Sequence, residues 1–254
     1  MRSDTVRAVT SDVPYSRRHI RAAWAVHALT GTGVIVGYAG LNAVVAGDAR
    51  ASILWLVAAL VVDGVDGPIA RRLDVSARIP TLDGNALDLI IDYFTCTIVP
   101  VAFLYRFDLL PHLIGGPTGF AILFVSAMWM ARRDQETLDG WFRGFPAEWN
   151  MIIPTLFLLR TSPWFNLSVC VALCGFTLSR VEFPHPLSVR AQRPISIAFL
   201  VAWVVAMVCL ACTNAADDLT RVALAVAPGW TVYQVVRRNT LTPAATDAAV
   251  ATRA

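Results

Sequence analysis

The sequence is built from apolar blocks, each about as long as a helix that crosses a lipid bilayer. Such a helix needs about 20 apolar residues. Eight blocks follow one another, at about 22–46, 51–72, 85–105, 113–131, 146–160, 163–180, 194–213 and 217–236. Because 56% of the 254 residues are hydrophobic and only 15% are charged, a soluble domain is excluded. We predict an all-α polytopic integral membrane protein with about eight transmembrane helices, a single domain over 1–254 with flexible tails at 1–14 and 239–254.

The basic side chains are distributed unevenly between these blocks. All 21 are arginines. Most lie in the two terminal segments and in every second connection, and the remaining connections carry only Arg50, Arg106, Arg160 and Arg221. Since connections rich in basic residues stay on the cytoplasmic side, we predict that both termini are cytoplasmic. The net charge of +3 gives no reason to expect a nucleic-acid partner.

Four aspartates lie in two consecutive blocks, where a charged group surrounded by lipid is costly and marks a functional site. VVDGVDGPIARR (61–72) contains Asp63 and Asp66, and TLDGNALDLIIDYF (81–94) contains Asp88 and Asp92. Helical spacing places each pair on one face of its helix. Because the first helix runs inward and the second outward, both pairs fall roughly 6–12 Å from the cytoplasmic ends. We predict that the four carboxylates meet.

Carboxylates that meet must be compensated, since two like charges about 4 Å apart repel by about 4 kcal/mol at an effective dielectric of 20. Oxygen ligands favour Mg²⁺ or Mn²⁺, so we predict one or two such ions among the four aspartates. Gly67, Ala70 and Gly84 lie beside the acids and leave room for a ligand, and Arg71 can meet a phosphate. Close helix packing through small residues is the alternative explanation for the glycines and the alanine.

Asp63-x-x-Asp66-Gly67-x-x-Ala70-Arg71, followed by Gly84-x-x-x-Asp88-x-x-x-Asp92, resembles the signature of the CDP-alcohol phosphotransferases, membrane enzymes of phospholipid synthesis. The spacer between Arg71 and Gly84 is longer than in most members. This spacer, together with the segments IPTLDGNALDLIIDY and FRGFPAEWN, resembles the bacterial branch of the family that uses CDP-diacylglycerol and choline.

This resemblance implies a metal-dependent phosphatidyl transfer that yields phosphatidylcholine and CMP, in the bacterial inner membrane with the active site toward the cytoplasm. It implies that Asp63, Asp66 and Asp88 ligate one Mn²⁺ or Mg²⁺ ion, and that Asp63, Asp88 and Asp92 ligate a second. Asp92 would also be the catalytic base. The residues that would bind CDP-diacylglycerol are Asp66, Gly67, Ala70, Arg71 and Gly84.

Choline carries a quaternary ammonium, which proteins hold against aromatic faces and carboxylates. The candidates near the predicted site are Tyr93, Trp141, Phe142, Glu148 and Trp149. Glu148 is our first choice. The alternatives are that the aromatic residues lie at the membrane interface and that Glu148 caps a helix or pairs with Arg143.

Other functions remain open from the sequence. The acceptor alcohol can differ, with serine, inositol phosphate or glycerol phosphate in place of choline. A phosphorylated acceptor would need a basic pocket, which Arg132, Arg133 and Arg190 can supply. A cation transporter is the non-enzyme alternative, but transport does not explain the small residues and the arginine beside the acids. A homodimer is compatible with the sequence.

Overall fold

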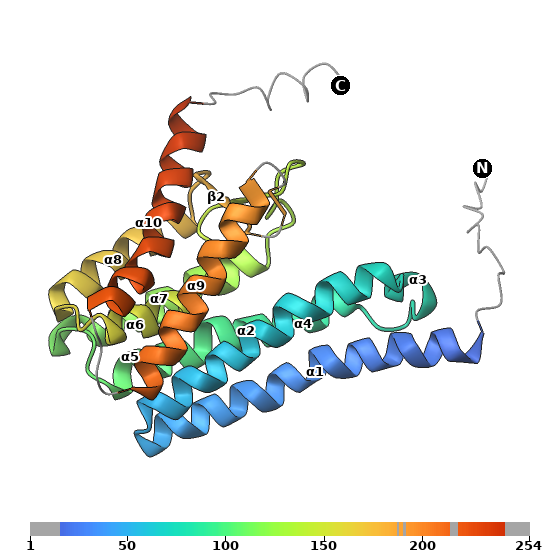
Figure 1. The fold of residues 1–254 in the computed structure, drawn as a ribbon, viewed down its shortest axis with the longest axis horizontal. Coiled ribbons are helices and arrows are strands. Elements are labelled where there is room, and N and C mark those ends of the chain that lie inside the picture. The colour runs from blue at the N-terminus through green and yellow to red at the C-terminus, as the bar shows by residue number, and fades with distance from the viewer. Residues whose placement is uncertain (1–15, 187, 190–191, 214–217, 242–254) are drawn as a thin grey trace, which may run out of the picture.

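The computed structural model describes residues 16–186, 188–189, 192–213 and 218–241. In chain order the elements are α1 (Arg17–Ala46), α2 (Ala49–Arg72), α3 (Val75–Arg78), α4 (Gly84–Asp92), the π-helix η1 (Tyr93–Ile98), α5 (Val99–Arg106), α6 (His112–Met130), β1 (Trp141–Arg143), α7 (Trp149–Leu158), α8 (Pro163–Thr177), β2 (Glu182–Pro184), α9 (Arg193–Cys212) and α10 (Asp218–Leu241) (Figure 1). The protein is an all-α polytopic membrane protein, as predicted. The expected tails lie outside the described residues, except for 239–241, which end α10.

Among the described residues, five helical segments are long and apolar enough to cross a membrane. They are Arg17–Ala46, Ala49–Arg72, Gly84–Arg106, His112–Met130 and Arg193–Cys212. The apolar helices α7 and α8 are shorter, and α10 coincides with the last predicted block. Each predicted block therefore corresponds to a helical segment, while the number of helices that cross the membrane stays a prediction.

The outer surface carries large apolar side chains, as expected of helices in contact with lipid. Ile35, Phe120 and Trp164 are exposed by 69%, 71% and 64%. Soluble proteins rarely leave many such side chains in water, whereas lipid tails solvate them without cost.

Helices α2 and α4 both pack against α1 at one edge of the molecule (Figure 1). Glycines on α1 allow this close approach. A Cβ atom on Gly33 would stand 2.7 Å from Cγ2 of Ile91, and one on Gly40 would stand 3.3 Å from Cβ of Trp55. Small residues at helix interfaces are common in membranes because they let backbones pack closely. This packing sets the distance between α2 and α4, the two helices that carry the aspartates.

The main hydrophobic core is built mostly from α2, α5, α6, α7 and α9, with single buried residues from α1, α8 and α10. Two buried tryptophans in it are fixed by hydrogen bonds from their indole N–H groups. Trp149 donates to Ser126 Oγ at 2.9 Å, and Trp203 donates to Thr155 Oγ1 at 3.1 Å. These bonds satisfy polar atoms that would be costly to bury alone.

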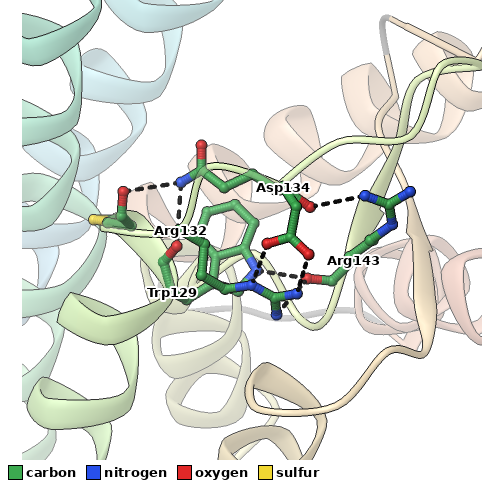
Figure 2. A network of polar contacts seen from close by, with 6 residues as sticks. Trp129, Arg132, Asp134 and Arg143 are labelled. Atoms are coloured by element: carbon green, nitrogen blue, oxygen red, sulfur yellow. Dashed lines mark hydrogen bonds and ion pairs between the residues drawn. The ribbon is translucent and has the colours of Figure 1, made fainter.

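Strands β1 and β2 form a short antiparallel pair. Along the chain, β1 follows α6 and β2 precedes α9. The loop that leads into β1 is fixed by the network in Figure 2. Arg132 forms an ion pair with Asp134 at 3.0 Å, and Trp129 Nε1 donates to the carbonyl oxygen of Arg143 at 2.8 Å. Arg143 Nη1 in turn donates to the carbonyl oxygen of Asp134 at 3.3 Å. The network anchors this loop to the end of α6.

Candidate active site

Helix α2 presents Asp63 and Asp66 in its second half. The helix begins after Asp48, whose carboxylate accepts a hydrogen bond from the Ala51 N–H at 2.9 Å. Pro68 lies inside the helix just after Asp66. Because proline has no N–H, the carbonyl of Gly64 loses its usual i→i−4 donor. An additional backbone acceptor therefore lies next to Asp63.

Helix α4 presents Asp88 and Asp92. It begins after Asp83, whose side chain accepts hydrogen bonds from the N–H groups of residues 85 and 86 at 3.0 and 3.1 Å. Asp83 is thus the N-cap that fixes the start of α4 at Gly84, one turn before Asp88. Asp92 is the last residue of α4, immediately before η1.

The π-helix η1 is a feature that the sequence analysis did not predict. It interrupts the third apolar block directly after Asp92, and Thr95 within it donates to the carbonyl oxygen of Ile91 at 3.0 Å. Short π-helical turns inside α-helices occur frequently at functional sites. Hydropathy carries no signal for such a turn, because the segment stays equally apolar in either helix type.

The four predicted acids converge between α2 and α4. Ligand atoms of Asp63, Asp88 and Asp92 all lie within 4.8 Å of one another. Asp66, only 4% exposed, lines the same small cavity. Thr30 and Gly33 of α1 complete one wall, and Thr95 of η1 another.

The charge of this cluster is not compensated by the protein. Among the described residues, none of the four carboxylates forms a hydrogen bond or an ion pair. Glu148 lies close enough to interact electrostatically with Asp63 and Asp92, and burial, together with the charge of Asp63, raises the pKa of Glu148 to about 7. The cluster is an all-oxygen set that can bind a metal ion, and its chemistry fits a hard divalent cation.

The small residues beside the acids each lie close to side chains of neighbouring residues. Nη1 of Arg71 stands 3.3 Å from the position that a Cβ on Gly67 would take, so the guanidinium folds back over this glycine. Gly84 faces His27 of α1, with 2.9 Å between a built Cβ and Cε1 of the histidine. Ala70 packs against the small apolar cluster formed by α1 and α3.

The residues proposed from the sequence for choline do not all meet at this site. Glu148 occupies the N-cap position of α7 and makes no side-chain capping bond there, so only an electrostatic interaction with the helix dipole remains of the capping explanation. Tyr93 begins η1 next to Asp92, and its hydroxyl donates to the carbonyl oxygen of Leu123 at 3.1 Å. Trp149 is 0% exposed and packs against Phe145 in the main core.

Trp141 and Phe142 lie on β1, and Trp141 lines a different cavity, which also contains Arg71. The guanidinium of Arg238 stands 5.0 Å from the Trp141 ring centre. Phe142 stacks on His185 with 4.9 Å between ring centres. One face of the Trp141 ring is therefore covered by Arg238, and one face of the Phe142 ring is covered by His185.

The arginines that a phosphorylated acceptor would require lie elsewhere. Arg132 is paired with Asp134, as Figure 2 shows, and Arg133 is exposed in the following loop. Arg190 lies outside the described residues. The residues found to line the acidic cavity include no arginine.

Three known proteins that are similar to this chain share one name, phosphatidylcholine synthase. No family model matches the chain. A phosphatidylcholine synthase from Pseudomonas aeruginosa is 38% identical over 195 residues, covering 77% of this chain and 82% of the relative. A phosphatidylcholine synthase from Brucella melitensis is 36% identical, covering 71% of the chain and 66% of the relative. One from Mesorhizobium japonicum is 33% identical, covering 78% and 75%.

Proposed function

The chain belongs to the phosphatidylcholine synthases, and we propose that it transfers the phosphatidyl group of CDP-diacylglycerol to choline at the aspartate cluster between α2 and α4. The observation that carries the proposal is the convergence of Asp63, Asp88 and Asp92 within 4.8 Å, with no cation of the protein to compensate them in the described part of the chain. Four ionised carboxylates in a membrane bundle are costly, and a cationic partner lowers that cost.

The residues that would hold the metal are the four aspartates. We assign Asp63, Asp66 and Asp88 to one Mn²⁺ or Mg²⁺ ion, and Asp63, Asp88 and Asp92 to a second. Divalent ions held by these carboxylates would offset the charge of a diphosphate, which would make the phosphorus more electrophilic and CMP a better leaving group.

Asp92 is the residue that we assign as general base. It accepts the proton of the choline hydroxyl, whose oxygen then attacks the lipid-linked phosphorus of CDP-diacylglycerol. A bond forms between this oxygen and phosphorus, the bond from phosphorus to the oxygen of CMP breaks, and the electron pair leaves with CMP. The position of Asp92 at the junction of α4 and η1 supports this role, because residues from both segments line the cavity.

Choline would lie beside Glu148 and Tyr93. The carboxyl group of Glu148 interacts electrostatically with Asp63 and Asp92, which supports a position near the acceptor, and the cation of choline would favour the ionised form of this group. The ring of Tyr93 follows Asp92 directly and can offer a face to the ammonium. Trp149 supports this corner by packing, since it has no exposed surface.

The donor headgroup would lie along Gly67, Ala70, Arg71 and Gly84. Arg71, folded over Gly67, can donate charge-assisted hydrogen bonds to a phosphate. This end of α2 carries Arg71 and Arg72, so the positive-inside rule puts it on the cytoplasmic side of the inner membrane, where water-soluble choline is supplied.

The test is to incubate the purified full-length protein with CDP-diacylglycerol, Mn²⁺ and labelled choline, serine, inositol and glycerol 3-phosphate in parallel. We expect CMP release and a labelled lipid with choline alone. Consumption of glycerol 3-phosphate without choline would replace the acceptor assignment while leaving the metal site unchanged. Absence of metal-dependent CMP release with every acceptor would instead favour a transporter.

A further inference from the structure

A second cavity, larger than the acidic one, lies where α2 ends, α9 begins and α10 ends. Its volume is about 900 Å³, large enough for a phosphate-bearing headgroup or nucleotide. Residues that line it include Arg71, Trp141, His185, Arg193, Arg237 and Arg238.

One of these arginines has a structural role. Arg238 forms ion pairs with Asp139 at 2.9 Å and with Glu182 at 2.5 Å, and its guanidinium lies over Trp141. The charge of Arg238 is therefore already satisfied by two carboxylates. These contacts join α10 to β2 and to the loop before β1, and they fix the wall of the cavity.

The other three arginines are exposed, and in the described part of the chain they have no acidic partner. Among the described residues, four arginines and two acids, Glu136 and Asp139, line the cavity. With Glu182, which also pairs with Arg238, counted as a third acid, one positive charge remains in excess. Arg193 is also the first residue of α9, a helix of 20 residues whose N-terminal dipole adds partial positive charge.

The histidine in the wall does not add to this charge. Burial, and after it the positive charge of Arg71, lower the pKa of His185 to about 4. His185 is therefore neutral at pH 7, and the preference of the cavity for anions depends on Arg71, Arg193 and Arg237.

We propose that this cavity binds a phosphate-bearing anion at a site separate from the aspartate cluster. The two sites are joined by Arg71, which lines the cavity while its guanidinium lies over Gly67 beside the acids. An anion bound here would share this guanidinium with the donor. The inference rests on the proposed function in one respect only, namely that Arg71 also binds the donor, CDP-diacylglycerol. The phosphate can come from a soluble nucleotide such as CMP or from the headgroup of an anionic lipid.

The first arm of the test measures soluble anions. The full-length protein in detergent, with divalent metals chelated, is titrated calorimetrically with CMP and with inorganic phosphate. We expect saturable binding that Arg193→Gln and Arg237→Gln each weaken by about tenfold or more, since a hydrogen bond to a charged group contributes about 1.5–3 kcal/mol. Arg133→Gln is the matched control, because it removes an exposed arginine that does not line the cavity.

The second arm measures lipid. The same four proteins are purified from mixed micelles of phosphatidylcholine and phosphatidylglycerol, and the retained lipids are counted per protein. A headgroup site would retain phosphatidylglycerol in the wild type and in Arg133→Gln, with a clear loss in the two cavity variants.

A change in either arm that is confined to the cavity variants supports the site and identifies the source of the phosphate. Equal binding and equal lipid retention by all four folded proteins would overturn it. Both arms omit metal and donor, so this result does not depend on catalysis. Arg193→Gln and Arg237→Gln change different helices, and unaltered melting temperatures would show that each variant is folded.

Discussion

Gly37 of α1 lies against Thr95 of η1 so closely that a Cβ on Gly37 would stand 2.8 Å from Cγ2 of the threonine. Phe94 is at a similar distance, with its ring 2.9 Å from the same position. Thr95 also lines the acidic cavity. The absence of a side chain at Gly37 therefore allows the π-helical turn to pack against α1 beside the aspartates.

The first prediction follows from this contact. Gly37→Ala should destabilise the protein by about 1–3 kcal/mol, because an added methyl group forces the packed backbones to shift. It should also lower activity by displacing η1. Gly31→Ala on the same helix is the control, since nothing lies within 4 Å of its built Cβ. Melting temperatures in detergent would measure the difference, and equal values for the two variants would contradict the contact.

The second prediction separates the roles of the acids. Asp63→Asn, Asp66→Asn and Asp88→Asn should lose activity together with metal affinity, because each removes a charged ligand. Asp92→Asn should keep measurable metal and CDP-diacylglycerol binding but lose turnover, since a general base contributes about 10²–10⁴-fold. Calorimetric metal titration beside the rate assay would show this. A rate for Asp92→Asn above about a tenth of wild type would exclude it as the base.

The third prediction concerns choline. Glu148→Gln should raise the Michaelis constant for choline with little change in that for CDP-diacylglycerol, because only the acceptor carries a positive charge for the carboxylate to attract. We expect a loss of roughly 2- to 30-fold, taking as its scale the about 0.5–2 kcal/mol that one cation–π contact to an ammonium contributes. Glu148→Asp should recover part of it.

Trp149→Phe is the comparison for this test. Its indole N–H donates to Ser126 in the core, so removing it should lower stability more than choline affinity. An equal rise in both Michaelis constants for Glu148→Gln would assign this residue to the metal site rather than to choline.

The helices and the convergence of the aspartates could be predicted because both depend on local rules. Hydropathy shows which residues avoid water, and the helical period places Asp63 with Asp66 and Asp88 with Asp92. The start of the third block was also visible in principle, since Asp83 directly precedes Gly84 as an N-cap.

The rest depends on contacts between distant segments, which periodicity does not report. Arg238 lies on α10 and Trp141 lies on β1, yet the guanidinium packs over the indole ring. They meet because β1 pairs with β2, and Arg238 binds Glu182 of β2. Trp141 was predicted as a choline candidate because an aromatic face can hold a quaternary ammonium. In the fold it lines the basic cavity instead.

The fourth prediction concerns the orientation of the bundle. Ser76 of α3 and Leu138, which is 99% exposed, lie in arginine-rich connections and should face the cytoplasm. Leu113 at the start of α6 is 95% exposed and lies after an arginine-poor connection, so it should face outward.

Single cysteines at these three positions, in a background without the five native cysteines, can be labelled in intact cells with a membrane-impermeant thiol reagent. Leu113→Cys should react at once, whereas Ser76→Cys and Leu138→Cys should react only after the membrane is opened. Leu138 is preferred to the neighbouring Asp139 because Asp139 is held by Arg238, and its loss would disturb the cavity wall. The opposite labelling pattern would invert the bundle and move the aspartate cluster to the outer half of the membrane, away from cytoplasmic choline.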